Sequence, residues 1–270
     1  MEYIKGITIN CPGIWEPELF GYFLLSNDSV SFYYANCNKL FRLSDNGLKP
    51  HLLYTFAPPD NLPLPYHWEI VEDDYTYILF NSSIGIETSK DLLLKAIPNL
   101  LLDKYQLLRK PEKFLIESPF HFDEYCISHK GQTGFLCKKD KVPMWTFRAR
   151  AYLYTEIKRY KNCVYFGTGG MGGYFYLIDL STGVPLAQVK TGGTSCIEVE
   201  GNNCYFLQCD RHAKLIHLNM DNGEIVDSIP LPGVSSEHSR LQIIQGKVHA
   251  ITFEYEKGSL RNAVWNIVNL

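Results

Sequence analysis

The sequence predicts an all-β protein built from a repeated unit of short strands. The first observation is composition: 14% of the 270 residues are aromatic, including 18 Tyr and 15 Phe, and many stand beside Val or Ile. Aromatic and β-branched side chains suit the half-buried surface of a pleated sheet. The second observation is a repeat, because a shift of 40 residues places residues 162–193 over residues 202–233. A repeat of this length predicts stacked supersecondary units.

The two copies share aromatic, aliphatic and turn residues. Each copy reads as strand, loop, strand, tight polar turn and strand. The turns DLSTG and NMDNG open with Asp or Asn and close with Gly, which takes a positive φ without steric cost, as hairpin turns require. The matched pairs are Tyr165 and Tyr205, Phe166 and Phe206, Ile178 and Leu218, Asp179 and Asn219, Gly183 and Gly223, and Gly193 and Gly233.

Weaker copies over the rest of the chain complete the architecture. Units of four antiparallel strands at this spacing are typical of a β-propeller. We predict a single propeller domain over residues 1–270, most simply with six four-stranded blades; seven blades is the alternative. Leucines at helical spacing predict a short helix over 98–112. The predicted blades cover residues 17–57, 66–98, 112–148, 150–191, 192–232, and 234–270 together with 1–10.

The N-terminal strand is expected to complete the last blade. Residues 3–9, YIKGITI, alternate between polar and apolar, and the last unit lacks one strand. Pairing the two ends of the chain removes two exposed sheet edges and closes the ring.

The fourth unit resembles the repeats of the PQQ-like (quinoprotein dehydrogenase-like) propeller superfamily. The matching residues are Val164 to Gly169, Tyr176 to Asp179, and the turn Thr182-Gly183. The resemblance covers two units well and concerns scaffold residues. Enzymes of that superfamily hold a quinone over a Trp floor beneath adjacent paired cysteines. This chain has no adjacent cysteines, so no cofactor is predicted.

The glycine-rich run Gly167 to Gly173 invites comparison with a phosphate loop. A phosphate loop precedes a helix N-terminus, whose exposed amides bind the anion. Here the following residues, YFYLIDL, read as a strand, and a Lys followed by Ser or Thr is missing. The run is therefore predicted to be a loop between two neighbouring strands.

Charge and cysteine usage exclude several classes of partner. The net charge of -3 and a pI of about 6.2 predict no nucleic-acid partner and no membrane partner. No export signal or run of ~18 apolar residues is present. Eight cysteines without a Cys-x-x-Cys spacing read as free core thiols. A cytoplasmic location is therefore expected.

Catalytic patterns are sparse. His121 and Asp123 are expected on one face of a strand. The acidic run over residues 69–74 could line a calcium site but reads better as a hairpin tip. No nucleophile elbow is present. Acids scattered over several blades can still converge at a channel mouth, so a metal-dependent hydrolase or lyase acting on a sugar or lactone remains an alternative.

Binding to another protein agrees best with these residues. The loops between second and third strands, and those joining blades, should share one face rich in interface-forming side chains. We predict a non-enzymatic protein-binding propeller that inhibits another protein, such as a bacterial immunity protein covering a toxin domain. A scaffold subunit of a larger complex is a further alternative. The predicted contact residues are Trp68, Arg148, Arg150, Tyr152, Met171, Arg211 and His212.

Overall fold

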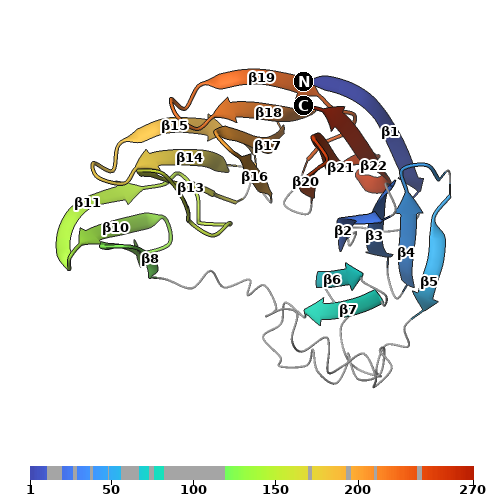
Figure 1. Cartoon of the computed structure of the whole chain (residues 1–270), viewed down its shortest axis with the longest axis horizontal. Coiled ribbons are helices and arrows are strands. Elements are labelled where there is room, and N and C mark those ends of the chain that lie inside the picture. Colours follow the sequence, from blue (N-terminus) through green and yellow to red (C-terminus); the bar gives the residue numbers. More distant parts are fainter. Residues whose placement is uncertain are drawn as a thin grey trace. The chain divides into compact units, whose positions relative to one another are not determined.

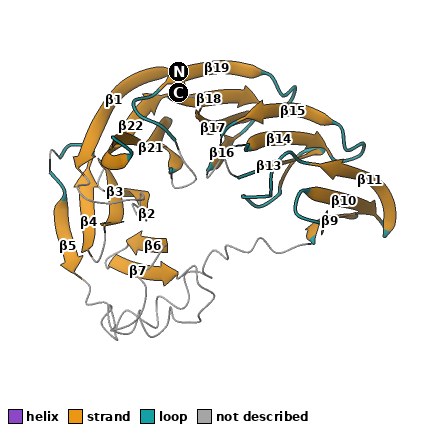
Figure 2. Cartoon of the chain, turned by 180° about the vertical axis from the view of Figure 1, so that it is seen from behind, coloured by secondary structure: helices purple, strands orange, loops and turns teal. Residues whose placement is uncertain are grey.

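All regular structure in the described residues is β (Figures 1 and 2). The predicted all-β class with four-stranded antiparallel sheets is thereby confirmed. The number of blades and the closure of a ring stay predictions. The computed structural model describes residues 1–10, 20–26, 29–36, 39–47, 49–55, 67–72, 76–81, 119–169, 172–192, 196–209, 212–235 and 239–270.

The chain divides into two compact units. Unit 1 contains Met1–Gly6, Leu115–Glu254 and Val264–Leu270, and unit 2 contains Ile7–Phe114 and Tyr255–Ala263. We number the sheets 1 to 6 in chain order.

Unit 2 contains sheets 1 and 2. Sheet 1 has the order β2-β3-β4-β5, and sheet 2 pairs β6 with β7. The predicted helix over 98–112 lies outside the described residues. The strands are β2 (Phe20–Ser26), β3 (Ser29–Asn36), β4 (Lys39–Ser44), β5 (His51–Thr55), β6 (His67–Glu72) and β7 (Thr76–Asn81).

Unit 1 contains sheets 3, 4 and 5. In each sheet four consecutive strands pair in chain order, and the first and fourth strands form the edges. The strands are β8 (Phe120–Phe122), β9 (Tyr125–Lys130), β10 (Gly134–Lys139) and β11 (Val142–Arg148); β12 (Lys158–Tyr160), β13 (Cys163–Gly167), β14 (Tyr174–Asp179) and β15 (Pro185–Lys190); and β16 (Ile197–Glu200), β17 (Asn203–Cys209), β18 (Ala213–Asn219) and β19 (Ile225–Pro230).

Sheet 6 joins the two ends of the chain. Its order is β1-β22-β21-β20, so the N-terminal strand is the edge strand beside the C-terminal strand, as predicted. The strands are β20 (Leu241–Ile244), β21 (Lys247–Glu256), β22 (Ser259–Asn269) and β1 (Glu2–Asn10).

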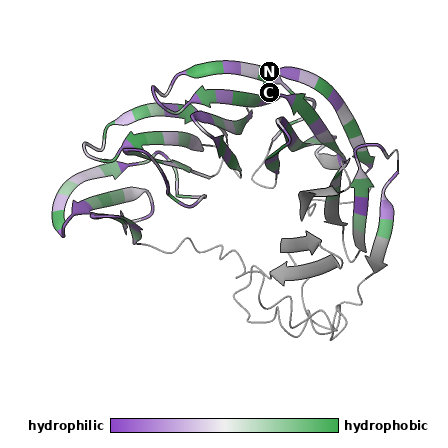
Figure 3. Cartoon of the chain, in the orientation of Figure 1, coloured by the Kyte–Doolittle hydropathy of each residue, from purple (hydrophilic) through white to green (hydrophobic). Residues whose placement is uncertain are grey.

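Apolar side chains pack between successive sheets of unit 1. Phe135 of sheet 3 meets Phe166 of sheet 4 with ring centroids 5.2 Å apart. Phe175 of sheet 4 stacks on Phe206 of sheet 5 at 4.6 Å. Burying each such ring contributes about 1.5–3 kcal/mol, and Figure 3 shows hydrophobic residues along the inner strands of these sheets. The matched repeat pairs therefore lie at equivalent core positions.

The predicted DLSTG turn is confirmed. The Asp179 carboxylate accepts hydrogen bonds from the backbone N–H groups of Ser181 (3.0 Å) and Thr182 (2.8 Å). Gly183 takes a φ of +74° and donates its N–H to the Asp179 carbonyl at 2.8 Å. The second copy repeats this geometry, because Gly223 also has a φ of +74° and bonds to Asn219.

Two placements differ from the sequence prediction. Asp123 lies in the turn after β8, with a φ of 52°, and not on the strand that holds His121. It turns out of the strand because β8 and β9 are joined by a two-residue hairpin, which favours positive φ. Trp68 lies in β6 and not in the connection before it.

Candidate protein-binding site at the loop end of unit 1

The sheets of unit 1 have two different ends. The loop end consists of the links between second and third strands and the connections between successive sheets. The turn end consists of the tight turns that join first to second and third to fourth strands. In sheets 3, 4 and 5 the turn end includes residues 140–141, 180–184 and 220–224, and the loop end includes residues 131–133, 149–157, 168–169 and 172–173.

The glycine-rich run belongs to the loop end. β13 ends at Gly167 and β14 begins at Tyr174, and these two strands are antiparallel neighbours. The prediction of a loop between neighbouring strands is therefore confirmed. Thr168 secures the start of β14, since its hydroxyl accepts the Tyr174 N–H at 2.8 Å.

Arg150 is held in place by two tyrosines of sheet 4. Its backbone N–H donates to the Tyr176 hydroxyl at 3.0 Å, and its Nη1 donates to the Tyr174 hydroxyl at 3.0 Å. The guanidinium carbon lies 5.2 Å from the centroid of the Tyr174 ring, within cation–π range. Burial raises the pKa of Tyr176, so its hydroxyl stays neutral and accepts this hydrogen bond. Arg150 nevertheless remains exposed to solvent.

The connection after Arg150 is hydrogen-bonded to the end of β13. Gly169 donates its N–H to the Tyr152 carbonyl at 2.9 Å, and Tyr154 donates its own to the Gly167 carbonyl at 3.0 Å. A Cβ on Gly169 would lie 2.7 Å from the Tyr152 ring and 2.8 Å from the Tyr154 ring. Glycine is therefore required there for the two rings to pack, and 48% of Tyr152 stays exposed.

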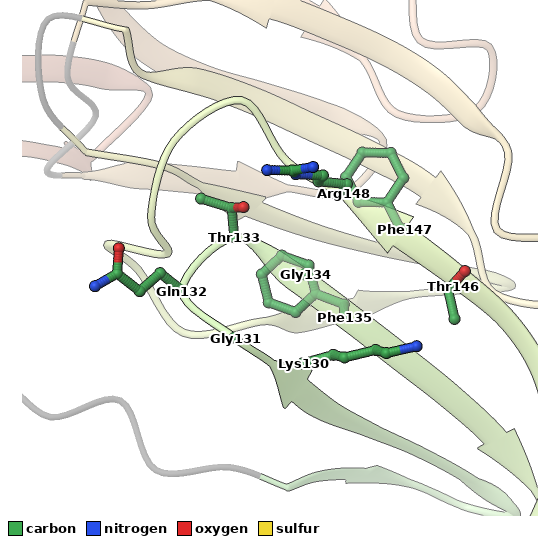
Figure 4. Close-up of a pocket in the computed structure, with 9 residues that line it drawn as sticks. All are labelled: Lys130, Gly131, Gln132, Thr133, Gly134, Phe135, Thr146, Phe147 and Arg148. Atoms are coloured by element: carbon green, nitrogen blue, oxygen red, sulfur yellow. The ribbon is translucent and has the colours of Figure 1, made fainter.

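A hollow of about 630 Å³ lies at the loop end of sheet 3, lined by residues 130–135 and 146–148 (Figure 4). Lys130, Gly134 and Arg148 are direct partners across β9, β10 and β11. A Cβ on Gly134 would collide with the Lys130 carbonyl oxygen, so this position must be glycine. Figure 4 shows Lys130 extending toward Thr146, with Arg148 extending the other way. Both cations are exposed.

The structure gathers three of the predicted contact residues. Arg148, Arg150 and Tyr152 lie on or directly after β11. His212 is exposed in the link between β17 and β18, also at the loop end. Of Trp68 in unit 2 only the backbone is described. Met171 and Arg211 lie outside the described residues. The role of all seven predicted contact residues in binding stays a prediction.

Four residues of this surface are not among the predicted contact residues: Lys130, Tyr154, Tyr174 and Lys190. Tyr174 and Lys190 are direct cross-strand partners on β14 and β15. Tyr174 opens a run of aromatic residues that reads as core, yet as the first residue of its strand it is only half-buried. The signal that could have found it is its place immediately after the loop.

Charges separate between the two ends of sheets 3 to 5. Counting loops, turns and the two outermost residues of each strand, with Arg159 of the three-residue strand β12 assigned to the turn end, the described loop end has seven cations and two carboxylates, and the turn end has five cations and seven carboxylates. The loop-end residues are Lys130, Arg148, Arg150, Lys158, Lys190, Lys214, Arg240, Glu156 and Glu198. The turn-end residues are Lys138, Lys139, Lys141, Arg159, Lys161, Asp123, Glu124, Asp140, Asp179, Glu200, Asp221 and Glu224.

The cations of the turn end are largely paired. Arg159 of sheet 4 pairs with Asp123 of sheet 3, and Lys161 of sheet 4 lies 2.5 Å from Asp221 of sheet 5. Lys139 lies 3.4 Å from Glu124. By contrast, Lys130, Arg148, Arg150 and Lys190 form no ion pair with any described residue.

Buried titratable groups of unit 1 belong to the core. Burial raises the pKa of Cys137 to about 11 and that of Tyr165 to about 12. Both groups are therefore protonated at neutral pH. Burial also raises the pKa of Glu198, although nearby Lys158 acts in the opposite direction. No three His, Cys, Asp or Glu side chains gather as a metal site within the described part of the chain.

No family model matches this chain, and no curated protein matches it either. Among solved structures it is similar to BamB from Moraxella catarrhalis, with 15% identity and a TM-score of 0.36 over 90% of this chain and 71% of the BamB chain. BamB is built of PQQ-like β-propeller repeats, the scaffold that the fourth unit resembles.

Two computationally designed proteins are also similar. Ika8 shows 11% identity and a TM-score of 0.38 over 90% of this chain and 69% of its own. Ika4 shows 14% identity and a TM-score of 0.36 over 53% of this chain and 86% of its own. Similarities at this level say nothing about function, and the fold class rests on the sheets themselves. No helix able to cross a bilayer occurs in the described residues.

Proposed function

We propose that this chain is a non-enzymatic binding protein that holds another protein against the loop end of unit 1. The observation that supports this most is the cluster around Arg150, in which exposed cationic and aromatic groups are fixed by hydrogen bonds to the sheets. Arg and Tyr dominate the energetics of protein interfaces. Fixing them before binding lowers the entropic cost of association.

In its finer form the proposal is a cytoplasmic inhibitor that covers the active site of its partner, as an immunity protein covers a toxin. A broad, loop-bearing face on a rigid set of sheets suits this task, because the contacts are spread over several loops. The partner is expected to be a folded protein domain held at a one-to-one ratio.

Quantitative affinity capture from the cells that express the protein tests this proposal. Three baits are compared: the wild type, the double variant Arg150→Glu/Tyr152→Ala, and the control Lys247→Glu. Lys247 is exposed at the turn end of sheet 6 and undergoes the same charge reversal as Arg150. Thermal unfolding of each bait verifies that it is folded.

We expect one protein to be enriched in near-equal amount by the wild type and by the control, and to be lost from the double variant. Enrichment of no protein by any folded bait would contradict the proposed function. Equal enrichment by all three baits would show that binding uses another surface.

A further inference from the structure

We infer that the partner presents a carboxylate-rich surface to the loop end, and that Arg148 and Arg150 are its principal contacts. This inference rests on the protein-binding function proposed above and specifies the chemistry of the partner. It follows from the charge separation between the two ends of unit 1 and from the way Arg150 is held.

The first step concerns unpaired charge. The turn end neutralises three of its cations with carboxylates of the same or the neighbouring sheet. At the loop end Lys130, Arg148, Arg150 and Lys190 form no such pair with any described residue. A partner that covers these groups removes their water, so it must supply negative charge to offset the lost hydration. Complementary charge also raises the association rate.

The second step concerns geometry. Arg150 uses one Nη1 hydrogen bond on the Tyr174 hydroxyl, which positions the guanidinium over the ring at 5.2 Å. The remaining N–H donors of its planar fork form no hydrogen bond with a described side chain. A carboxylate fits such a fork with two parallel hydrogen bonds. Lys190 lies directly across from Tyr174 on β15, so the side chain of a second cation leaves the same face of the sheet.

The third step favours a protein over a nucleic acid. The chain has a net charge of -3, so a long polyanion would meet repulsion from the acidic turn end as well as attraction at the loop end. Base stacking requires an open aromatic face. Tyr174 has Arg150 over its ring and Tyr176 5.9 Å away, so its ring is already occupied. Tyr152 is the more exposed ring, and it already packs edge to face against Tyr154 with ring centroids 6.4 Å apart. A compact acidic patch on a protein meets neither obstacle.

Binding of short charged probes to the full chain tests the inference. Fluorescence anisotropy would follow a labelled oligoglutamate peptide, an oligolysine peptide and a short single-stranded DNA, each at low and at physiological salt. The proteins compared are the wild type, Arg148→Glu/Arg150→Glu, Arg150→Lys and Lys247→Glu. Circular dichroism and thermal unfolding confirm that each variant is folded.

We expect oligoglutamate to bind the wild type and Lys247→Glu equally, and to weaken as salt rises. The double charge reversal should lower its affinity by about tenfold or more, because two attractive contacts become repulsive. Arg150→Lys should give an intermediate affinity, since the charge remains while the planar fork is lost. Any binding of oligolysine should use the acidic turn end, so the double charge reversal should not weaken it.

Three results would overturn the inference: oligoglutamate fails to bind the wild type, it loses the same affinity in Lys247→Glu as in the double variant, or the DNA binds more tightly than the peptide. These failures are separable from failure of the proposed function. A protein partner captured by wild type and by Arg148→Glu/Arg150→Glu alike would uphold protein binding and refute the acidic contact.

Discussion

The two ends of unit 1 are built from the same strands but differ in how their side chains are used. At the turn end, charges pair across neighbouring sheets, as Arg159 does with Asp123. At the loop end, cations and tyrosines stand exposed and are held mainly by backbone and hydroxyl groups, as Arg150 is. The difference teaches that ion pairs between sheets 3, 4 and 5 form at the turn end, whereas near the loop end sheets 3 and 4 are packed together by aromatic rings such as Phe135 and Phe166. The cations of the loop end that form no ion pair are thereby left for a partner.

The turn end also holds a close contact between sheets 3 and 4. Trp145 of β11 donates its Nε1–H to the Leu180 carbonyl at 2.8 Å. A Cβ on Gly183 would lie 2.6 Å from the Cγ and Cδ2 atoms of that indole ring. Gly183 therefore satisfies two demands, because it takes the positive φ of the turn and leaves room for the Trp145 ring.

Replacing Gly183 should give the largest loss of stability. Gly183→Ala is expected to lower the free energy of unfolding by about 3 kcal/mol, because it adds the strain of a left-handed residue to a collision with Trp145. Gly201→Ala is the matched control, since Gly201 has a φ of +62° and nothing within 4 Å of its added Cβ. It should cost only about 1 kcal/mol. Equal losses in urea unfolding would refute the role of the Trp145 contact.

A smaller loss is expected from Trp145→Phe. The substitution removes the donor to the Leu180 carbonyl while keeping an aromatic ring, so unfolding should become easier by about 1 kcal/mol. Partner binding should be unchanged, because Trp145 lies near the turn end. Weaker partner binding with unchanged stability would indicate an interface at the turn end, contrary to the proposed loop-end site.

The pH dependence of unfolding should report the Asp179 turn. Hydrogen bonds from Ser181 and Thr182 hold the pKa of the Asp179 carboxyl below its usual range. The folded pKa is therefore lower than the unfolded pKa, and the stability it provides is present above about pH 4 and lost as pH falls through the folded pKa.

The measurement is the midpoint of thermal unfolding at pH 6 and at pH 3. The difference between the two should be smaller in Asp179→Asn than in the wild type. Asp140→Asn is the control, because the Asp140 carboxylate accepts no hydrogen bond from the described residues. It should keep the wild-type difference. If both variants behave alike, the hydrogen bonds to Asp179 do not contribute.

The smallest effect is expected from Lys161→Gln. The ion pair between Lys161 and Asp221 is well exposed, with side-chain exposures of 65% and 45%. Solvent screening leaves such pairs with little net contribution. The midpoint of thermal unfolding should not shift measurably. A loss as large as that of Trp145→Phe would mean that this exposed ion pair stabilises the fold as much as the Trp145 hydrogen bond does.

Local chemistry made the sheets and turns predictable. Asp179 and Gly183 predict the hairpin between β14 and β15. The hydrogen bonds to the Asp179 carboxylate and the positive φ of Gly183 depend only on neighbouring residues. The closing strand β1 was predictable from its alternation and from the missing strand of the last unit. The contact of Trp145 with Gly183 was not, since it joins two sheets and depends on their packing. Asp123 lies in a turn because β8 ends at Phe122. The alternation of side chains along the sequence does not indicate where a strand ends.

Of the candidate site, the sequence predicted the arginines but not their support. Arg150 stands out as a cation in a connecting loop. Its fixation depends on Tyr174 and Tyr176, whose hydroxyls reach it only once sheet 4 packs beside that loop. The absence of carboxylate partners is likewise a property of three-dimensional arrangement, because Glu156 is close in sequence yet forms no ion pair with Arg150.

Hydrogen–deuterium exchange of the chain with and without its captured partner tests the central claim most directly. If the loop end binds the partner, amides of residues 148–154, 168–169 and 172–174 should gain protection. Amides of residues 139–142, 179–184 and 219–224 should exchange as they do in the free chain. Protection confined to these turn-end segments would contradict the account.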